Sequence, residues 1–187
     1  TIDVIHGRGL ILDNSRHSMG IYLKDISKYV LGYIIGNNTS AELVTLTNLQ
    51  YQDITSYNGK YFNINNGTPF EVYISEILDF ATEYEVDKYN QLSLLSYINA
   101  IETDPLTHVH ETNATRKASI NLENINVNYN NMFASYSAHP NVADFLDYEY
   151  EDDANEENES DVVFYKYLKE ISDFHSMPVI ISDTGIP

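Results

Sequence analysis

PVIISDTG, residues 178–185, is an apolar run that ends abruptly in polar residues and a glycine. Four other stretches share this form. In each, consecutive apolar residues lie between polar or turn-forming residues at the two ends. They are Val4–Ile5, Tyr29–Ile35, Leu92–Ile98 and Met132–Ala138. Runs of this kind are typical of strands that are buried on both faces, as in parallel sheets covered by helices. The sequence therefore predicts five parallel strands, the last of them at Pro178–Ser182.

Two helical stretches lie between these runs. The clearer one opens at Thr68-Pro69-Phe70-Glu71, which offers an N-cap threonine, a proline at the first helical position and a capping-box glutamate. It runs to about Tyr89, and its apolar side chains recur at helical spacing, as Phe70, Ile74, Ile77, Leu78, Ala81 and Tyr84. A second helix is predicted over about Asp161–His175, directly before the last strand. Strand, helix and strand in repeated order indicate βα units and an α/β fold.

The composition limits the partners that we expect. The chain of 187 residues has 10 lysines and arginines against 28 aspartates and glutamates, so its formal charge is −18. Such a negative field repels phosphate groups and anionic lipids, which predicts no nucleic acid and no membrane as partner. The absence of cysteine excludes disulfides, thiolate zinc sites and thiol nucleophiles. Carbohydrate, protein and metal partners remain open, and the composition indicates no compartment.

The length suits a single domain, residues 1–187. The start at Thr1 is neither a methionine nor a signal peptide, and the chain stops directly after an apolar run, so we interpret it as an excerpt of something larger. The acidic stretch Asp147–Asp161 is interpreted as a solvated loop, with weak calcium binding as the alternative. The asparagine-rich stretch Asn121–Asn131 is interpreted as an irregular surface loop.

Polar side chains follow the apolar runs at the points where the predicted strands end. Because the carboxyl ends of parallel strands meet at one edge of a sheet, we expect these side chains to converge on one rim and to form the site. They are His6, Asn37, Asn38, Asn99, Asp104, Tyr136, His139 and Asp183.

The order and the amino-acid sequences of these segments resemble those of the clan A glycoside hydrolases, which are (β/α)8 barrels. Leu31–Asn38, LGYIIGNN, is similar to the end of that family's fourth strand, and Met177–Pro187, MPVIISDTGIP, is similar to its seventh. Ser96–Leu106 and Phe133–Leu146 are similar to fifth- and sixth-strand segments of bacterial barrels of this type. The resemblance covers strands three to seven only. It implies a partial (β/α)8, or TIM-type, barrel that another chain or a missing segment would complete.

The resemblance also implies a retaining mechanism, in which an acid/base glutamate and a nucleophilic glutamate lie roughly 5–5.5 Å apart. Asn38 stands at the acid/base position, and an amide neither donates a proton nor returns as a base at a useful rate. Asp183 stands at the nucleophile position, where it keeps the charge but is one methylene shorter. Thr39 and Ala100 stand where the resemblance leads us to expect tryptophans that stack on sugar rings. We therefore expect impaired catalysis.

Several of these residues have ordinary structural interpretations as well. Asn38 also suits a turn, and Asp183 suits a helix N-cap or a turn before Gly185. His6 and His139 also suit hydrogen-bonded rim positions without a role in proton transfer. These alternatives stay open at the level of the sequence.

A metal site is a further alternative, because His-x-His on an extended segment points both rings the same way. The residues that would form it are Asp104, His108, His110 and Glu111. The resemblance already explains the segment that begins at Asp104 without a metal. We therefore assign no metal ligands and expect no cofactor.

Two functions follow from these observations. The first is a glycoside hydrolase-like barrel segment, acting on O-glycosidic bonds or descended from enzymes that do, with Asp183 as nucleophile and with impaired catalysis. The second is a non-catalytic scaffold that binds carbohydrate or another protein through the barrel rim, since a fold alone does not imply chemistry. The sequence does not indicate which sugar or linkage would be recognised.

Overall fold

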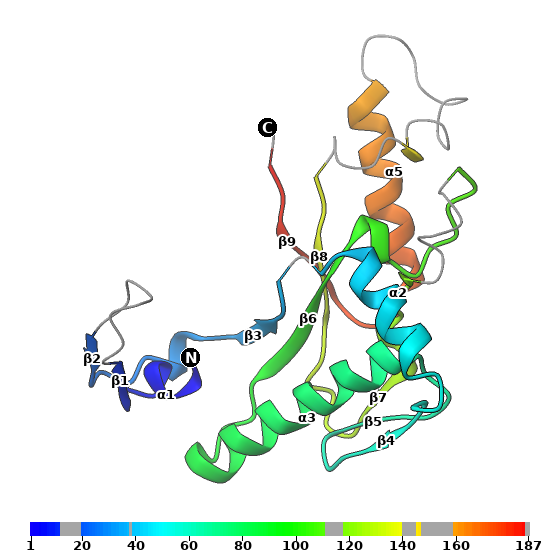
Figure 1. Cartoon of the computed structure of the whole chain (residues 1–187). Coiled ribbons are helices and arrows are strands. Elements are labelled where there is room, and N and C mark those ends of the chain that lie inside the picture. Colours follow the sequence, from blue (N-terminus) through cyan, green and yellow to red (C-terminus); the bar gives the residue numbers. More distant parts are fainter. Residues whose placement is uncertain (12–19, 38, 111–117, 140–144, 147–158, 186–187) are drawn as a thin grey trace.

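The fold is mixed α/β and is built around a four-stranded parallel sheet (Figure 1). The computed structural model describes residues 1–11, 20–37, 39–110, 118–139, 145–146 and 159–185. In their order across the sheet, the strands are β3 (Gly32–Ile35), β6 (Leu94–Ala100), β8 (Ala134–Ser137) and β9 (Val179–Asp183). All three strand pairs are parallel. The α/β class with parallel strands is therefore confirmed, and no barrel closes within the described residues.

Helix α3 (Pro69–Tyr89) begins as the sequence predicts. The Thr68 side chain accepts a hydrogen bond from the Glu71 backbone N–H at 3.3 Å, and the Glu71 carboxylate accepts one from the Thr68 backbone at 2.8 Å. Asn90, in the left-handed region with φ 51°, ends the helix. Helix α5 (Glu159–Phe174) matches the second predicted helix, and α2 (Ala41–Gln50) precedes α3. Every helix in the described part of the chain is too short or too polar to cross a membrane.

The helices cover one face of the parallel sheet, which we call the helix face. Side chains alternate between the two faces of a strand, and the register pairs Asn99 with Tyr136 on the same face. The Tyr97 ring, also on this face, meets Phe70 of α3 edge-on at 6.0 Å. The Tyr136 hydroxyl lies 2.7 Å from Nε2 of His175, which directly follows α5. The hydrophobic core lies between this face and the helices.

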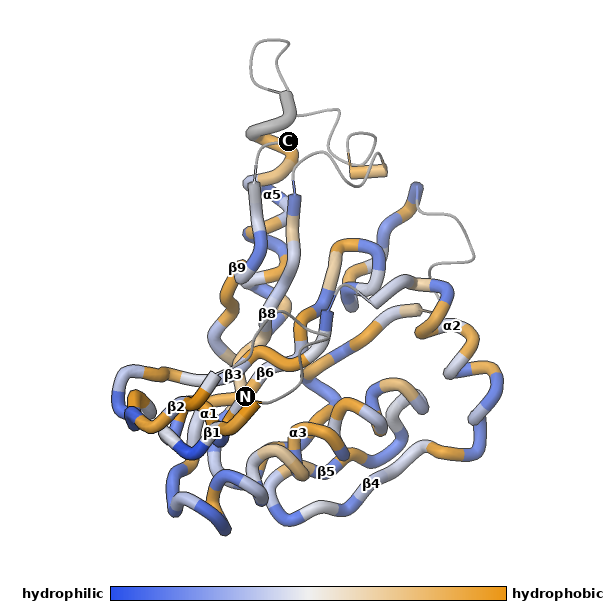
Figure 2. The backbone as a smooth tube through the Cα atoms, turned by 60° about the vertical axis from the view of Figure 1, so that its left-hand side comes forward, coloured by the Kyte–Doolittle hydropathy of each residue, from blue (hydrophilic) through white to orange (hydrophobic). Residues whose placement is uncertain are grey.

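The opposite face, which we call the open face, leaves apolar side chains in contact with solvent. Ile34 of β3 and Ile180 of β9 are 41% and 40% exposed. The two inner strands carry buried serines on this face, Ser96, Ser135 and Ser137. Figure 2 shows the four strands side by side, with hydrophilic colour at the carboxyl ends of β8 and β9.

A second, antiparallel sheet packs against α3 and corrects one prediction. It contains β4 (Tyr57–Asn58), β5 (Phe62–Ile64) and β7 (Ile125–Val127). Strand β7 lies inside the stretch interpreted as an irregular surface loop, and Ile125 is buried. That interpretation is wrong here because strands of two or three residues are too short to show a hydrophobic period. The Asp79 carboxylate of α3 binds this sheet by accepting the backbone N–H groups of Tyr61 and Phe62 at 2.6 and 2.9 Å.

The first of the five predicted strands is also wrong. The apolar pair Val4–Ile5 belongs to a short helix, α1 (Ile2–Ile5), and an antiparallel pair follows it, β1 (Gly9–Ile11) with β2 (Gly20–Tyr22). Two adjacent apolar residues fit one turn of helix as well as a strand. Gly7, with φ +67°, turns the chain after α1, where an added Cβ would lie 2.7 Å from the Asp25 backbone nitrogen.

Candidate functional site

The structure does not bring all the predicted rim residues together. Tyr136, Asn99 and Asp104 are buried, whereas His139 and Asp183 are accessible at the carboxyl ends of β8 and β9. The prediction of a single rim shared by all eight residues is therefore wrong. Asn37 lies exposed just past β3, and Asn38 lies outside the described residues.

His6 lies at the opposite end of the sheet. Its Nε2 is 3.1 Å from Oε1 of Glu85, near the end of α3. The other oxygen of Glu85 accepts the backbone N–H of Ser93, which directly precedes β6. His6 is therefore at the amino end of β6 and does not contribute to a site at the carboxyl ends. The prediction placed it on the rim because it took residues 4–5 for a strand.

Asp183 and His139 are accessible, and together with the buried Ser137 they form a group that we call the Asp183 cluster. The Ser137 hydroxyl donates to Oδ2 of Asp183 at 3.2 Å. Nε2 of His139 lies 3.5 Å from the same oxygen. The side chains of His139 and Asp183 are 30% and 54% exposed, so solvent and small solutes reach both.

A register shift between β8 and β9 creates this cluster. Tyr136 pairs with Ile181, but the next residue, Ser137, pairs with Asp183 and skips Ser182. In an unbroken ladder Ser137 would lie opposite Ser182, and Asp183 would point to the other face. The shift therefore places the carboxylate beside Ser137, on the open face. The Ser182 hydroxyl instead accepts a hydrogen bond from Ser135 at 2.8 Å.

Asn99 and Tyr136 use their polar atoms inside the protein. The Asn99 amide donates to the Ile120 carbonyl at 3.0 Å and accepts the Thr103 hydroxyl at 2.6 Å. The Tyr136 hydroxyl contacts His175, whose Nδ1 is 2.9 Å from the Glu123 carboxylate. Burial raises the pKa of the Tyr136 hydroxyl above its ordinary value. These groups support the junction of β6, β8 and α5 and offer no accessible atom to a ligand.

Asp104 is paired within the core as well. Both of its carboxylate oxygens lie 3.1 Å from Nε2 of His108, and both side chains are buried. Burial raises the pKa of Asp104, and the hydrogen bond with His108 opposes that shift. Glu111, part of the alternative metal cluster, lies outside the described residues. Across the described ranges, no three or more side chains of the kinds that bind metals are grouped to hold an ion.

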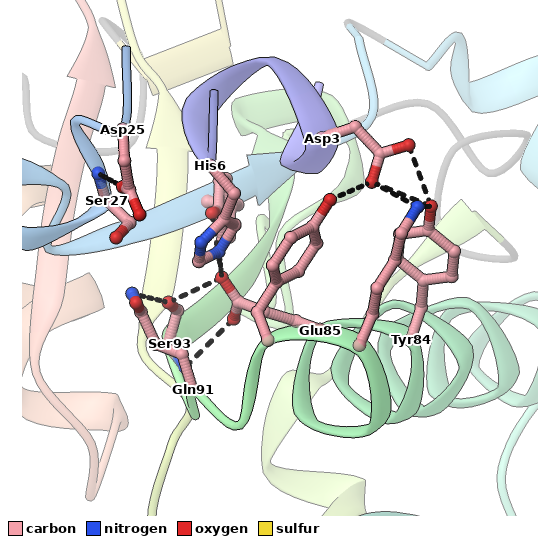
Figure 3. Close-up of polar contacts among 11 residues, drawn as sticks. Asp3, His6, Asp25, Ser27, Tyr84, Glu85, Gln91 and Ser93 are labelled. Atoms are coloured by element: carbon pink, nitrogen blue, oxygen red, sulfur yellow. Dashed lines mark hydrogen bonds and ion pairs between the residues drawn. The ribbon is translucent and has the colours of Figure 1, made fainter. Parts of the chain in front are cut away.

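The sequence reasoning missed a buried carboxylate cluster around Glu85 (Figure 3). Besides His6, the Glu85 carboxylate accepts the hydroxyls of Tyr33 at 2.8 Å and Ser93 at 3.1 Å. The His6 ring stacks on Tyr89, with ring centroids 3.8 Å apart. Figure 3 shows His6 and Ser93 both directed at the Glu85 carboxylate. The sequence does contain a signal for this cluster, because polar residues recur at helical spacing beside the apolar stripe of α3. They are Glu71, Ser75, Asp79, Thr82 and Glu85, and all five are buried in the structure.

Asp3 joins α1 to the same end of α3. Its carboxylate accepts hydrogen bonds from the hydroxyls of Tyr84 and Tyr89 and from Nζ of Lys88, at 2.6 to 2.8 Å. These bonds, that of Lys88 first, hold the pKa of Asp3 well below its ordinary value. The Asp3 and Glu85 clusters therefore fasten the amino-terminal segment to α3, and both are fully engaged with protein groups.

Comparison of the chain with protein families, with curated proteins and with solved structures found no match.

Proposed function

We propose that this chain is a glycoside hydrolase-like protein with impaired catalysis that binds carbohydrate through the Asp183 cluster. The resemblance of residues 31–38 and 177–187 to clan A glycoside hydrolases supports this proposal, and we propose a partial (β/α)8 barrel as the parent architecture. The order of β3, β6, β8 and β9 across the sheet follows their order in the chain, as it does for successive strands of such a barrel.

The exposed carboxylate of Asp183 is the observation that carries the proposal. It lies at the carboxyl end of a parallel strand, where α/β proteins bind their ligands. It is on the open face, beside the hydroxyl of Ser137 and the imidazole of His139. A carboxylate accepts hydrogen bonds from two sugar hydroxyls, Ser137 holds this carboxylate in place, and the accessible imidazole of His139 adds a group that donates or accepts. This combination suits vicinal hydroxyls of a sugar or a small polyol.

The same geometry argues against efficient hydrolysis. A retaining glycosidase needs its second carboxyl group roughly 5–5.5 Å from the nucleophile, with the glycosidic bond between them. His139 is the one titratable side chain in contact with Asp183 among the described residues, and it lies only 3.5 Å from Oδ2. At that distance it is bound to the carboxylate and does not flank a sugar from the other side. The acid/base position holds the amide of Asn38.

Binding should be weak. Each hydroxyl contact contributes about 0.5–1.5 kcal/mol after exchange with water, and the chain has no tryptophan to cover a sugar face. A few such contacts correspond to dissociation constants in roughly the millimolar range.

The test is a titration of the isotope-labelled full chain with a panel of mono- and disaccharides, followed through backbone amide shifts. We expect shifts concentrated at the Asp183 cluster and their loss in Asp183→Asn. Asp87→Asn is the matched control, because this aspartate is 63% exposed and lies on α3 beside Lys60. Shifts confined to residues 147–161, or shifts that persist unchanged in Asp183→Asn, would reject the proposal.

A protein-interaction scaffold is the second candidate, favoured by the exposed strand edges. Strands β3 and β9 are the two edges of the parallel sheet, and each carries an exposed isoleucine on the open face, Ile34 and Ile180. Unpaired strand edges offer backbone hydrogen-bonding groups to a further strand. Another chain, or a further segment that completes the barrel, is the partner that fits these edges.

A further inference from the structure

A pocket of about 480 Å³ lies between α2 and the first turns of α3 and shares no residue with the Asp183 cluster. Four of its eleven lining residues are aromatic. Phe70 and Tyr97 are almost completely buried and form its inner wall, whereas Tyr51 and Tyr73 are each 48% exposed and border its opening. The pocket is thus both accessible and apolar.

The aromatic rings form a continuous surface. The Phe70 ring lies 5.6 Å from that of Tyr73 and 6.0 Å from that of Tyr97, in tilted and edge-on arrangements. The Tyr97 hydroxyl is engaged with the Thr39 hydroxyl at 2.7 Å. This hydroxyl is therefore already bonded, and this part of the lining offers aromatic rings, whose faces carry partial negative charge and attract cations.

A carboxylate borders the same pocket. Glu76 is exposed, lies one turn after Tyr73 on α3 and belongs to the lining. No salt bridge within the described ranges involves it. The formal charge of −18 also favours a cation over an anion as ligand.

The remaining polar groups of the lining do not favour a sugar. The Thr47 hydroxyl donates to the Leu43 carbonyl at 2.8 Å, and the Thr39 hydroxyl is bonded to Tyr97 and to the Asn37 carbonyl. A polyol needs several free donors and acceptors, whereas this pocket combines aromatic faces with one carboxylate. That combination is complementary to a positive charge carried on an apolar body.

We propose that this pocket binds a small organic cation, with its ammonium group between the Tyr73 ring and the Glu76 carboxylate. The apolar body of the ligand packs against Phe70 and Tyr97, and Tyr51 closes the other side. The proposal is independent of carbohydrate binding at the Asp183 cluster, because the two places share no residue.

Three ligands that share a phenyl group and differ in charge test the proposal. They are 2-phenylethylammonium, 2-phenylethanol and phenylacetate, each titrated into the isotope-labelled full chain. We expect the ammonium compound to shift the amides around Tyr51, Tyr73 and Glu76 and to bind about tenfold more tightly than the alcohol. Phenylacetate should bind most weakly. Equal affinities of the ammonium compound and the alcohol, or shifts that map elsewhere, would overturn the proposal.

Two variants separate local recognition from the general charge of the protein. Glu76→Gln should lower the affinity for the ammonium compound toward that for the alcohol, with the attraction of the Tyr73 ring remaining, and leave the alcohol unaffected. Glu83→Gln removes the same charge from an exposed position of the same helix outside the pocket, and should leave both affinities unchanged. Equal losses in the two variants would overturn the proposal. Both positions are exposed, and thermal unfolding of each variant verifies that it folds.

Discussion

Oδ2 of Asp183 is shared by two neighbours, because it accepts the Ser137 hydroxyl at 3.2 Å and lies 3.5 Å from Nε2 of His139. Both neighbours therefore contact the same oxygen, and the other carboxylate oxygen, Oδ1, has no hydrogen bond to any described residue. The side chain is more than half exposed. Such a carboxylate is held in place and still presents an acceptor to a ligand, which is the arrangement that a binding site requires.

The chain should show negligible hydrolysis of aryl glycosides. Substrates with good leaving groups are the sensitive test, because they need little assistance from an acid in the first step. We expect no turnover above background in the wild type and no difference between it and Asp183→Asn. Turnover in the usual enzymatic range of about 1–10³ s⁻¹, abolished by Asp183→Asn, would show that the catalytic pair is functional after all.

Removal of the Glu85 carboxylate should destabilise the fold strongly. In Glu85→Ala the groups that bind this carboxylate, His6, Tyr33 and Ser93, lose their partner at a buried position. We expect a loss of about 3–5 kcal/mol in the free energy of unfolding, measured by urea denaturation. The exposed neighbour gives the control, since Glu83→Ala should change it by less than about 0.5 kcal/mol. A similar small loss in both variants would contradict this account of the Glu85 cluster.

The Asp3 cluster should make stability depend on pH in the acidic range. Because hydrogen bonds from Lys88, Tyr89 and Tyr84 lower the pKa of folded Asp3 below its ordinary value of 3.8, its contribution is complete above that value and is lost as the pH falls through the folded pKa. The difference in unfolding free energy between wild type and Asp3→Asn should therefore be larger near neutral pH than in strong acid.

Lys88→Met provides the comparison for that experiment, because Lys88 is the largest cause of the shift. In the Lys88→Met background, the effect of Asp3→Asn should depend much less on pH. Urea denaturation at a series of pH values measures both differences. An Asp3→Asn effect that stays constant from neutral pH into strong acid would be inconsistent with the depressed pKa.

The exposed strand edges should cause self-association. Analytical ultracentrifugation of the wild type should show an average mass that rises with concentration, since the edge strands β3 and β9 carry Ile34 and Ile180 on the open face. Replacing both isoleucines with lysine should reduce this association. A wild-type protein that stays monomeric at its highest soluble concentration would count against the scaffold function.

Local signals in the sequence predicted helices α3 and α5 and all four strands of the parallel sheet, but not helices α1 and α2. The start of α3 depends on residues 68–71 alone, which contain both halves of the capping box. Four of the five apolar runs are long enough to specify buried strands. The two-residue run at Val4–Ile5 is not, and the strands of the second sheet are equally short. These short elements are determined by tertiary contacts that no local pattern records.

The site was predictable only in part, for the same reason. The carboxyl ends of β8 and β9 identified His139 and Asp183, but the sequence does not reveal the register shift that brings Asp183 beside Ser137. Nor does it reveal that His6 meets Glu85, which is 79 residues away along the chain. Tyr136 lies at the expected strand end, but its side chain is buried on the helix face. The alternation of side chains along a strand does not indicate which face the helices cover.

The affinity for the tightest-binding disaccharide of the panel, compared between wild type, Asp183→Asn and Asp87→Asn, tests the central claim most directly. A hydrogen bond to a charged acceptor contributes about 1.5–3 kcal/mol, so Asp183→Asn should weaken binding by roughly tenfold or more. Asp87→Asn removes the same charge from a different surface and should leave the affinity unchanged. Equal affinities of the wild type and Asp183→Asn would contradict carbohydrate binding at the Asp183 cluster.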